Sequence, residues 1–100
     1  MSNNENFEFK VKLNNPDDAI LVTRMAKNYQ SEIDIQSNDR HYVVDAKSLM
    51  GILCLDLARE IIVSTPDDET GKSFMNDIAK YVVKWRRKLW NIIKNMINWH

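Results

Sequence analysis

The chain has little of several residue types, and each shortage excludes a class of protein. A single cysteine among 100 residues rules out a disulfide framework, and Cys54 lies in an apolar run where we expect it to be buried. Only two histidines are present, so the sequence predicts no metal site and no cofactor. The chain has neither an 18-residue apolar run nor an N-terminal signal segment, and we expect a cytoplasmic protein.

Glycine and proline are also scarce, with two of each, whereas apolar residues make up 44% of the chain. This composition indicates a packed globular chain and not a disordered one, and the length suits a single core. The net charge is zero but unevenly distributed. Residues 84–100 contain five basic residues and no acid, so residues 1–83 carry a net charge of −5. Nucleic-acid binding is not expected, because the basic residues are few and no recognition motif accompanies them.

Hydrophobic periodicity predicts four strands and three helices. Residues 7–13 alternate apolar and charged side chains, as a half-buried strand does. Asn15 can cap a helix that starts at Pro16 and extends to about Tyr29. Strands are expected at 33–35, 41–44 and 60–64, a short helix after Ser48, and a last helix from about residue 71 to the end of the chain. The order βαββαβα predicts an α+β (α/β) domain in which a four-stranded antiparallel sheet has three helices on one face.

One block carries the most specific signal. Residues 44–53 read VDAKSLMGIL, and Ser48 stands where it can cap the first turn of a short helix. Around Lys47 and Ser48 the sequence resembles the regulatory-serine region of HPr, the histidine phosphocarrier family of the bacterial sugar phosphotransferase system. The similarity covers about residues 6–83, with further matches at Ala26 and Tyr29. It implies an open-faced sandwich fold, which agrees with the element order.

The resemblance also implies where phosphate chemistry should occur. HPr proteins carry a Gly-x-His-x-Arg-Pro loop at the start of the first helix, and its histidine accepts a phosphoryl group from enzyme I. In this chain Asn15 falls at the histidine position and Asp17 at the arginine position. An amide cannot carry a phosphoryl group, and the carboxylates of Asp17 and Asp18 repel one. We therefore expect no catalytic residue and no enzyme activity, and His41 is expected to be a surface residue.

Ser48 is the remaining candidate for phosphorylation. The resemblance implies that a dedicated kinase phosphorylates the matching serine and that the product is a partner in carbon catabolite control. The alternative is that Ser48 only caps the helix. Lys47 could pair with a phosphate there. Leu49, Met50 and Leu53 correspond to the face on which HPr proteins dock their partners, and a Met/Leu surface suits docking.

The end of the chain departs from the family. Apolar residues recur there with spacings of three and four, which predicts a continuation of the last helix with an amphipathic seam. The seam consists of Met75, Ile78, Val82, Trp85, Leu89, Ile92, Met96 and Trp99. We divide the chain into an HPr-like domain, 1–83, and a basic, Trp-rich extension, 84–100. Trp85, Leu89, Ile92, Met96 and Trp99 would contact a second copy, a partner helix or an anionic membrane surface, or they would fold back on the domain.

Together these features predict a regulatory or adaptor protein related to the phosphotransferase system that cannot carry phosphohistidine. Its partners would be phosphotransferase-system or catabolite-control proteins, with HPr kinase among them. The alternative is an assembly or membrane-surface docking module that uses the C-terminal helix.

Overall fold

A computed structural model describes residues 6–85. The helices are α1 (Pro16–Ala26), α2 (Leu49–Leu53) and α3 (Asp68–Asp77), and a short 3-10 turn, Ala79–Tyr81, follows α3. The strands are β1 (Phe7–Val11), β2 (Asp34–Gln36), β3 (Val43–Asp45), β4 (Ile61–Thr65) and β5 (Val82–Trp85).

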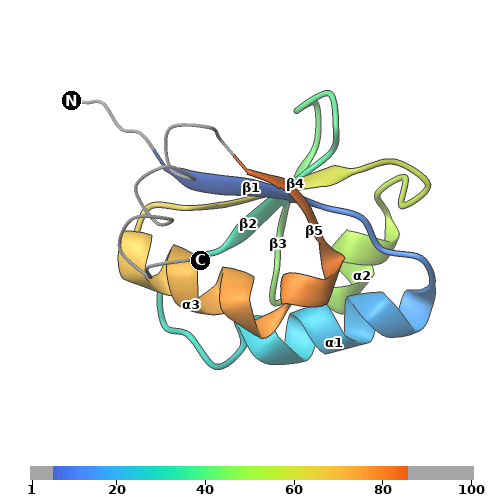
Figure 1. The fold of residues 1–100 in the computed structure, drawn as a ribbon. Helices are drawn as coiled ribbons and strands as arrows, with labels where there is room; N and C mark the ends of the chain where they lie inside the picture. Colours follow the sequence, from blue (N-terminus) through green and yellow to red (C-terminus); the bar gives the residue numbers. More distant parts are fainter. Residues whose placement is uncertain (1–5, 86–100) are drawn as a thin grey trace.

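The strands form one sheet in the order β3-β2-β4-β1-β5, and every adjacent pair is antiparallel. All three helices lie against the same face, so the molecule has two layers (Figure 1). This arrangement confirms the predicted α+β architecture. The sheet has five strands instead of four, since β5 pairs with the outer side of β1.

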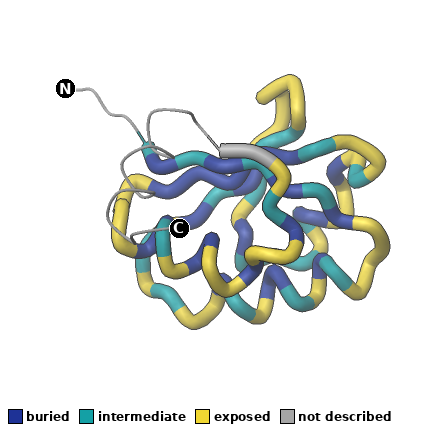
Figure 2. Tube along the Cα trace, viewed as in Figure 1, coloured by how far each residue is buried: buried dark blue, intermediate teal, exposed yellow. Residues whose placement is uncertain are grey.

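The core lies between the sheet and the helices (Figure 2). Along β1 the side chains of Phe7, Phe9 and Val11 are buried while the residues between them are half-buried, as the alternation predicts. From the helical layer Phe74 packs its ring against Phe9, with 6.4 Å between the ring centroids. Tyr29 meets the same Phe74 ring edge-to-face at 6.0 Å. These aromatic contacts join α3 to β1 and to the end of α1.

The prediction of one uninterrupted last helix is wrong. Helix α3 begins earlier than predicted, after the N-cap Asp67, and ends at Asp77. The chain then passes through the 3-10 turn into β5 and pairs with β1, with Lys10 opposite Lys84. Val82 and Val83 are β-branched, and β1 offers an edge of backbone hydrogen-bonding groups, so a strand is favoured here. Met75 and Ile78, the first two residues of the apolar seam, are buried in the core of the domain.

Two further expectations need correction. Cys54 is exposed and not buried, because α2 ends at Leu53 and the C-cap residue no longer faces the core. His41 is not in a strand, since β3 starts at Val43. It lies exposed in the β2–β3 turn with its ring 5.1 Å from that of Tyr42. No helix within residues 6–85 is long and apolar enough to cross a membrane.

Candidate functional site

The start of α1 is closed by its own side chains. Asn15 is the N-cap, and its Oδ1 accepts a hydrogen bond from the backbone N–H of Asp18 at 3.1 Å. In return, Oδ2 of Asp18 accepts from the backbone N–H of Asn14 at 2.8 Å and of Asn15 at 3.3 Å. This reciprocal arrangement is a capping box, and Pro16 has no N–H to donate. Three backbone N–H groups around the helix start, those of Asn14, Asn15 and Asp18, are therefore already bound by side-chain oxygens.

Asp18 also contacts the far end of the domain. The hydroxyl of Tyr81 donates to Oδ1 of Asp18 at 3.0 Å. The hydrogen bond from the Asn14 backbone, followed by that from Tyr81, lowers the pKa of Asp18 below its ordinary value. The group is consequently charged at neutral pH, and exposed Asp17 beside it adds a second acid to the first turn. A carboxylate occupies the position in which helix-start amides and dipole would favour a phosphate.

Ser48 caps α2, as the sequence predicts. Its Oγ accepts from the backbone N–H of Gly51 at 3.1 Å, and its own N–H donates to the carbonyl of Asp45 at 2.9 Å. The residue is half-buried. Lys47 is beside it in sequence, but Nζ of Lys47 donates to the carbonyl of Ser31 at 3.3 Å. A phosphate on Ser48 would compete with that carbonyl for the ammonium group.

The helix that Ser48 caps presents apolar side chains to solvent. Met50 is 78% exposed and Leu53 is 45% exposed. Leu49 is half-buried and packs against the core, and Ile52 is fully buried. We call Met50 and Leu53, with Lys47 and Leu49 beside them, the α2 surface. Such an exposed Met/Leu pair on a short helix is adaptable in shape.

The residues predicted at the C-terminal contact are only partly described. The backbone of Trp85 belongs to β5 and pairs with Phe9, so it is not part of a helix. Leu89, Ile92, Met96 and Trp99 lie outside the described residues. Between Asn6 and Trp85, no group of three or more His, Cys, Asp or Glu side chains is arranged to hold a metal ion.

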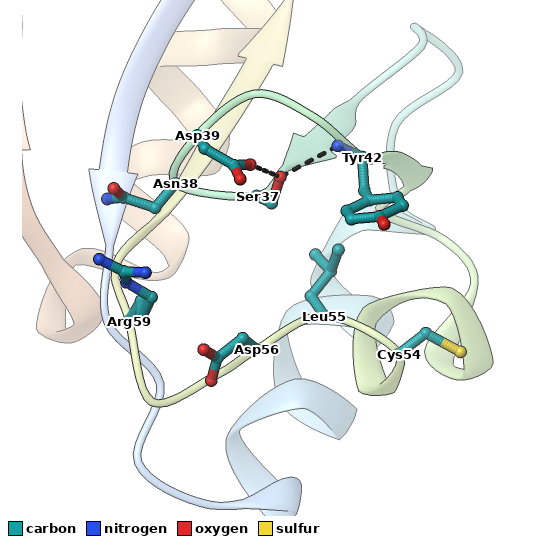
Figure 3. Close-up of a pocket in the computed structure, with 8 residues that line it drawn as sticks. All are labelled: Ser37, Asn38, Asp39, Tyr42, Cys54, Leu55, Asp56 and Arg59. Atoms are coloured by element: carbon teal, nitrogen blue, oxygen red, sulfur yellow. Dashed lines mark hydrogen bonds between the residues drawn. The ribbon is translucent and has the colours of Figure 1, made fainter.

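A pocket of about 220 Å³, which no sequence pattern predicts, lies between the β2–β3 turn and the loop from α2 to β4. Figure 3 shows the side chains that line it: Ser37, Asn38, Asp39, Tyr42, Cys54, Leu55, Asp56 and Arg59. They come from residues 37–42 and 54–59, two segments separated by the whole of β3 and α2. Neither segment carries a motif, so only the fold brings these residues together.

Comparisons with known proteins agree with this architecture. A family model described as "PTS HPr component phosphorylation site" matches residues 8–83. The crystal structure of the phosphocarrier protein HPr from Bacillus anthracis strain Ames superposes with a TM-score of 0.60 and 24% identity, covering 80% of this chain and 100% of that one. The histidine-containing phosphocarrier protein of a mycoplasma gives a TM-score of 0.50 and 20% identity, covering 77% of this chain and 98% of the other. No curated protein matches. At these identities the structural likenesses show the fold.

Proposed function

The chain belongs to the HPr family of the phosphotransferase system, and we propose that it is a cytoplasmic regulatory or adaptor member that does not carry phosphate on histidine. The observation that carries this proposal is the closed start of α1. Asp18 binds the backbone amides of Asn14 and Asn15 with a charged carboxylate, where a carrier needs room for a phosphoryl group.

The residue types at α1 support the same conclusion. The resemblance to the family assigns Asn15 to the histidine position, and its amide has no nucleophilic nitrogen to accept a phosphoryl group. Asp17 takes the position of an arginine, so a cation that would hold the phosphate is replaced by an anion. Both changes act against phosphoryl transfer at this place.

The α2 surface supports a role in binding other proteins. HPr-family proteins interact with other components of the phosphotransferase system. Met50 and Leu53 are exposed on α2, the helix that Ser48 caps, whereas Ile52 of the same helix is fully buried and anchors it to the core. We propose that Met50 and Leu53 contact the partner and that Lys47 and Leu49 border the contact.

We propose Ser48 as the regulatory phosphorylation site. Its Oγ accepts one hydrogen bond, from Gly51, and the residue is half-buried, so the hydroxyl is within reach of a kinase once that bond opens. Phosphorylation would add a charge of about −1.5 to −2 beside the α2 surface. Lys47 is the nearest cation in the sequence to pair with it.

The first test is phosphotransfer from phosphoenolpyruvate. The full chain is incubated with enzyme I and labelled phosphoenolpyruvate, with an active HPr as the positive control. We expect no label on this chain under conditions that fully label the control. Acid-labile phosphohistidine at His41 or His100 would overturn the proposal.

The second test separates capping from phosphorylation at Ser48. The full chain is incubated with HPr kinase and ATP, and the product is analysed by mass spectrometry. Ser48→Asn keeps a side-chain oxygen that caps α2 but removes the hydroxyl, whereas Ser48→Ala removes both. We expect the unchanged chain to be phosphorylated, both variants to remain unmodified, and only Ser48→Ala to lose about 1 kcal/mol of stability. Modification of Ser48→Asn would exclude Ser48 as the site.

The α2 surface is tested in the same assay. Met50→Asp places a charge in the proposed contact. The control is Val83→Asp, which adds the same charge at a residue that is 49% exposed on β5. Strand β5 lies at one edge of the sheet, and β3, the strand that precedes α2, lies at the other. We expect Met50→Asp to raise the KM of the kinase for this chain by about tenfold, as loss of one buried apolar contact does. Equal effects of the two variants would contradict docking through α2.

A second candidate is assembly or membrane docking through the C-terminal residues. Its support is the sequence pattern alone: Leu89, Ile92, Met96 and Trp99 keep the apolar spacing, and residues 86–100 contain basic residues but no acid. Analytical ultracentrifugation of the full chain, with Leu89→Lys/Ile92→Lys as the comparison, tests it. We expect self-association that the double variant abolishes, or, for a monomer, co-sedimentation with anionic liposomes.

A further inference from the structure

The pocket between the β2–β3 turn and the α2–β4 loop has an apolar side and a charged side. Leu55, only 7% exposed, and Tyr42 form the apolar side. Figure 3 shows Asp39, Asp56 and Arg59 around the rest of the cavity, while the thiol of Cys54 points away from it. An apolar wall with a few polar groups is a common feature of ligand sites. This hollow is open to solvent, since Asp39, Asp56 and Arg59 are exposed and Tyr42 is 64% exposed.

The two carboxylates are held in place but not neutralised. Oδ1 of Asp39 accepts from the hydroxyl of Ser37 at 2.7 Å and from the backbone N–H of His41 at 3.0 Å. Oδ1 of Asp56 accepts from the backbone N–H of Ala58 at 3.1 Å. These bonds fix each carboxylate through one oxygen. Within residues 6–85, no hydrogen bond or ion pair joins the second oxygen of either carboxylate to another side chain.

The guanidinium of Arg59 is also unpaired within that part of the chain. No ion pair joins it to Asp39 or Asp56, although all three line the same cavity. A planar guanidinium binds a carboxylate through two parallel hydrogen bonds. The pocket thus has an unused anion-binding group and two unused cation-binding groups.

The signs of these charges select the ligand class. A simple carboxylate would be attracted by Arg59 but repelled by Asp39 and Asp56, and a simple amine would meet the opposite conflict. A molecule with one charge of each sign satisfies both. The volume of about 220 Å³ is below that of sites for drug-sized ligands, so the molecule is small.

We propose that this pocket binds a free α-amino acid with an apolar side chain. Its carboxylate pairs with Arg59 and its ammonium group with Asp56, while Asp39 adds negative charge from the other side of the cavity. Its side chain lies against Leu55 and Tyr42. The site is independent of Ser48 and of the start of α1, so it stands or fails separately from the proposed regulatory function.

Three matched probes test the charge requirement by two-dimensional ¹H–¹⁵N NMR titration of the full chain at pH 7. Leucine carries both charges, leucinamide only the positive one and N-acetylleucine only the negative one. We expect leucine to cause saturable shifts at the amides of residues 37–42 and 54–59. The two other probes should bind about tenfold more weakly or less, since each lacks a charge-assisted hydrogen bond.

Variants assign the charges to residues. Arg59→Gln should weaken leucine binding about tenfold or more, and Arg24→Gln, the same change at an exposed position on α1, should leave it unchanged. Asp56→Asn keeps the oxygen that accepts from Ala58 but removes the charge. It should weaken binding of leucine and leucinamide without weakening that of N-acetylleucine.

The same titrations can overturn the proposal. Absence of saturable shifts with leucine would do so, as would saturable shifts confined to residues outside 37–42 and 54–59. Equal binding of leucine and N-acetylleucine would show that the carboxylates of the pocket play no part. Unchanged leucine affinity of Arg59→Gln would exclude the proposed pairing with the ligand carboxylate.

Discussion

At the scale of single residues, Asp34 is poorly matched to its neighbours. It lies opposite Asp45 in the register of β2 and β3, and Glu32 is two positions away. Burial, followed by the charges of Glu32 and Asp45, raises the pKa of Asp34. Since like charges directly opposite each other in a sheet are destabilising, we expect Asp34→Asn to increase the free energy of unfolding at pH 7 by about 0.5 kcal/mol, measured by urea denaturation.

The stability gained by Asp34→Asn should depend on pH, because the pKa of Asp34 is raised in the folded protein. A carboxyl group whose pKa is higher in the folded state than its ordinary value of 3.8 favours folding when it is protonated. That contribution is fully present below 3.8 and is lost as the pH rises through the raised pKa. The advantage of Asp34→Asn should therefore disappear in acid. Asp56→Asn, in an exposed loop, is the control, and an equal gain from it would contradict the assignment to Asp34.

A pair of buried threonines offers a second prediction at this scale. The hydroxyl of Thr23 on α1 is buried without a hydrogen-bond partner in the described chain, whereas that of Thr65 donates to the carbonyl of Glu32 at 2.7 Å. The same near-isosteric change should have opposite effects. We expect Thr23→Val to stabilise the protein by up to about 1 kcal/mol and Thr65→Val to destabilise it by about 1 kcal/mol, measured by thermal or urea unfolding. Equal losses of stability in both variants would show that the hydroxyl of Thr23 does have a hydrogen-bond partner.

At the scale of elements, the packing of α3 on β1 depends on Gly71. A Cβ atom added to Gly71 would overlap the ring of Phe7 and would lie 2.9 Å from the Phe7 Cβ, closer than such atoms approach. The helix would have to move away from the sheet. We expect Gly71→Ala to destabilise the protein by about 1–3 kcal/mol in urea unfolding despite the better helix propensity of alanine. Asn76→Ala, exposed on the same helix, should be nearly neutral, and a similar loss there would contradict this explanation.

The elements also show which features the sequence could predict. The caps Asn15 and Ser48 were predicted correctly, because a cap depends on three or four adjacent residues. The end of α3 was not. Apolar residues at 75, 78 and 82 keep a helical spacing, yet Ile78 leaves the helical conformation with φ −114° and ψ 31°. Residues 82–85 form a strand there because they can pair with the edge of β1, and that edge exists only in the folded sheet.

At the scale of the whole molecule, the sheet order brings together segments that the sequence keeps far apart. Because β5 pairs with β1, Tyr81, which directly precedes β5, lies close to the first turn of α1. Its hydroxyl donates a hydrogen bond to Asp18 there. The same folding sets the β2–β3 turn against the α2–β4 loop and forms the pocket. Neither arrangement has a local sequence signal. The family resemblance predicted the fold, but it could not predict these two contacts. Asp18 lies within the loop that the family motif covers, yet its partner Tyr81 and the residues that line the pocket lie outside that loop.

The hydrogen bonds of Asp18 at the start of α1 lead to a last prediction, on which substitutions would allow the chain to accept a phosphoryl group. Asn15→His alone should remain unlabelled by enzyme I and phosphoenolpyruvate, because Asp18 still binds the amides of residues 14 and 15 and still repels a phosphoryl group. The triple variant Asn15→His/Asp17→Arg/Asp18→Ala removes two negative charges and adds a positive one. It should be labelled at least about tenfold more than the single variant, since 1.4 kcal/mol of relieved repulsion is enough for that factor.

The control for this comparison is Asn15→His/Asp17→Arg, which retains Asp18. Loss of the Asn15 cap costs about 1 kcal/mol in each variant. Circular dichroism is therefore recorded before labelling, to establish that each variant is folded. If the double variant is labelled as well as the triple one, the carboxylate of Asp18 is not the obstacle. If the single variant is labelled as well as the triple one, the lack of a histidine alone explains the loss of carrier activity, and the closed helix start has no part in it.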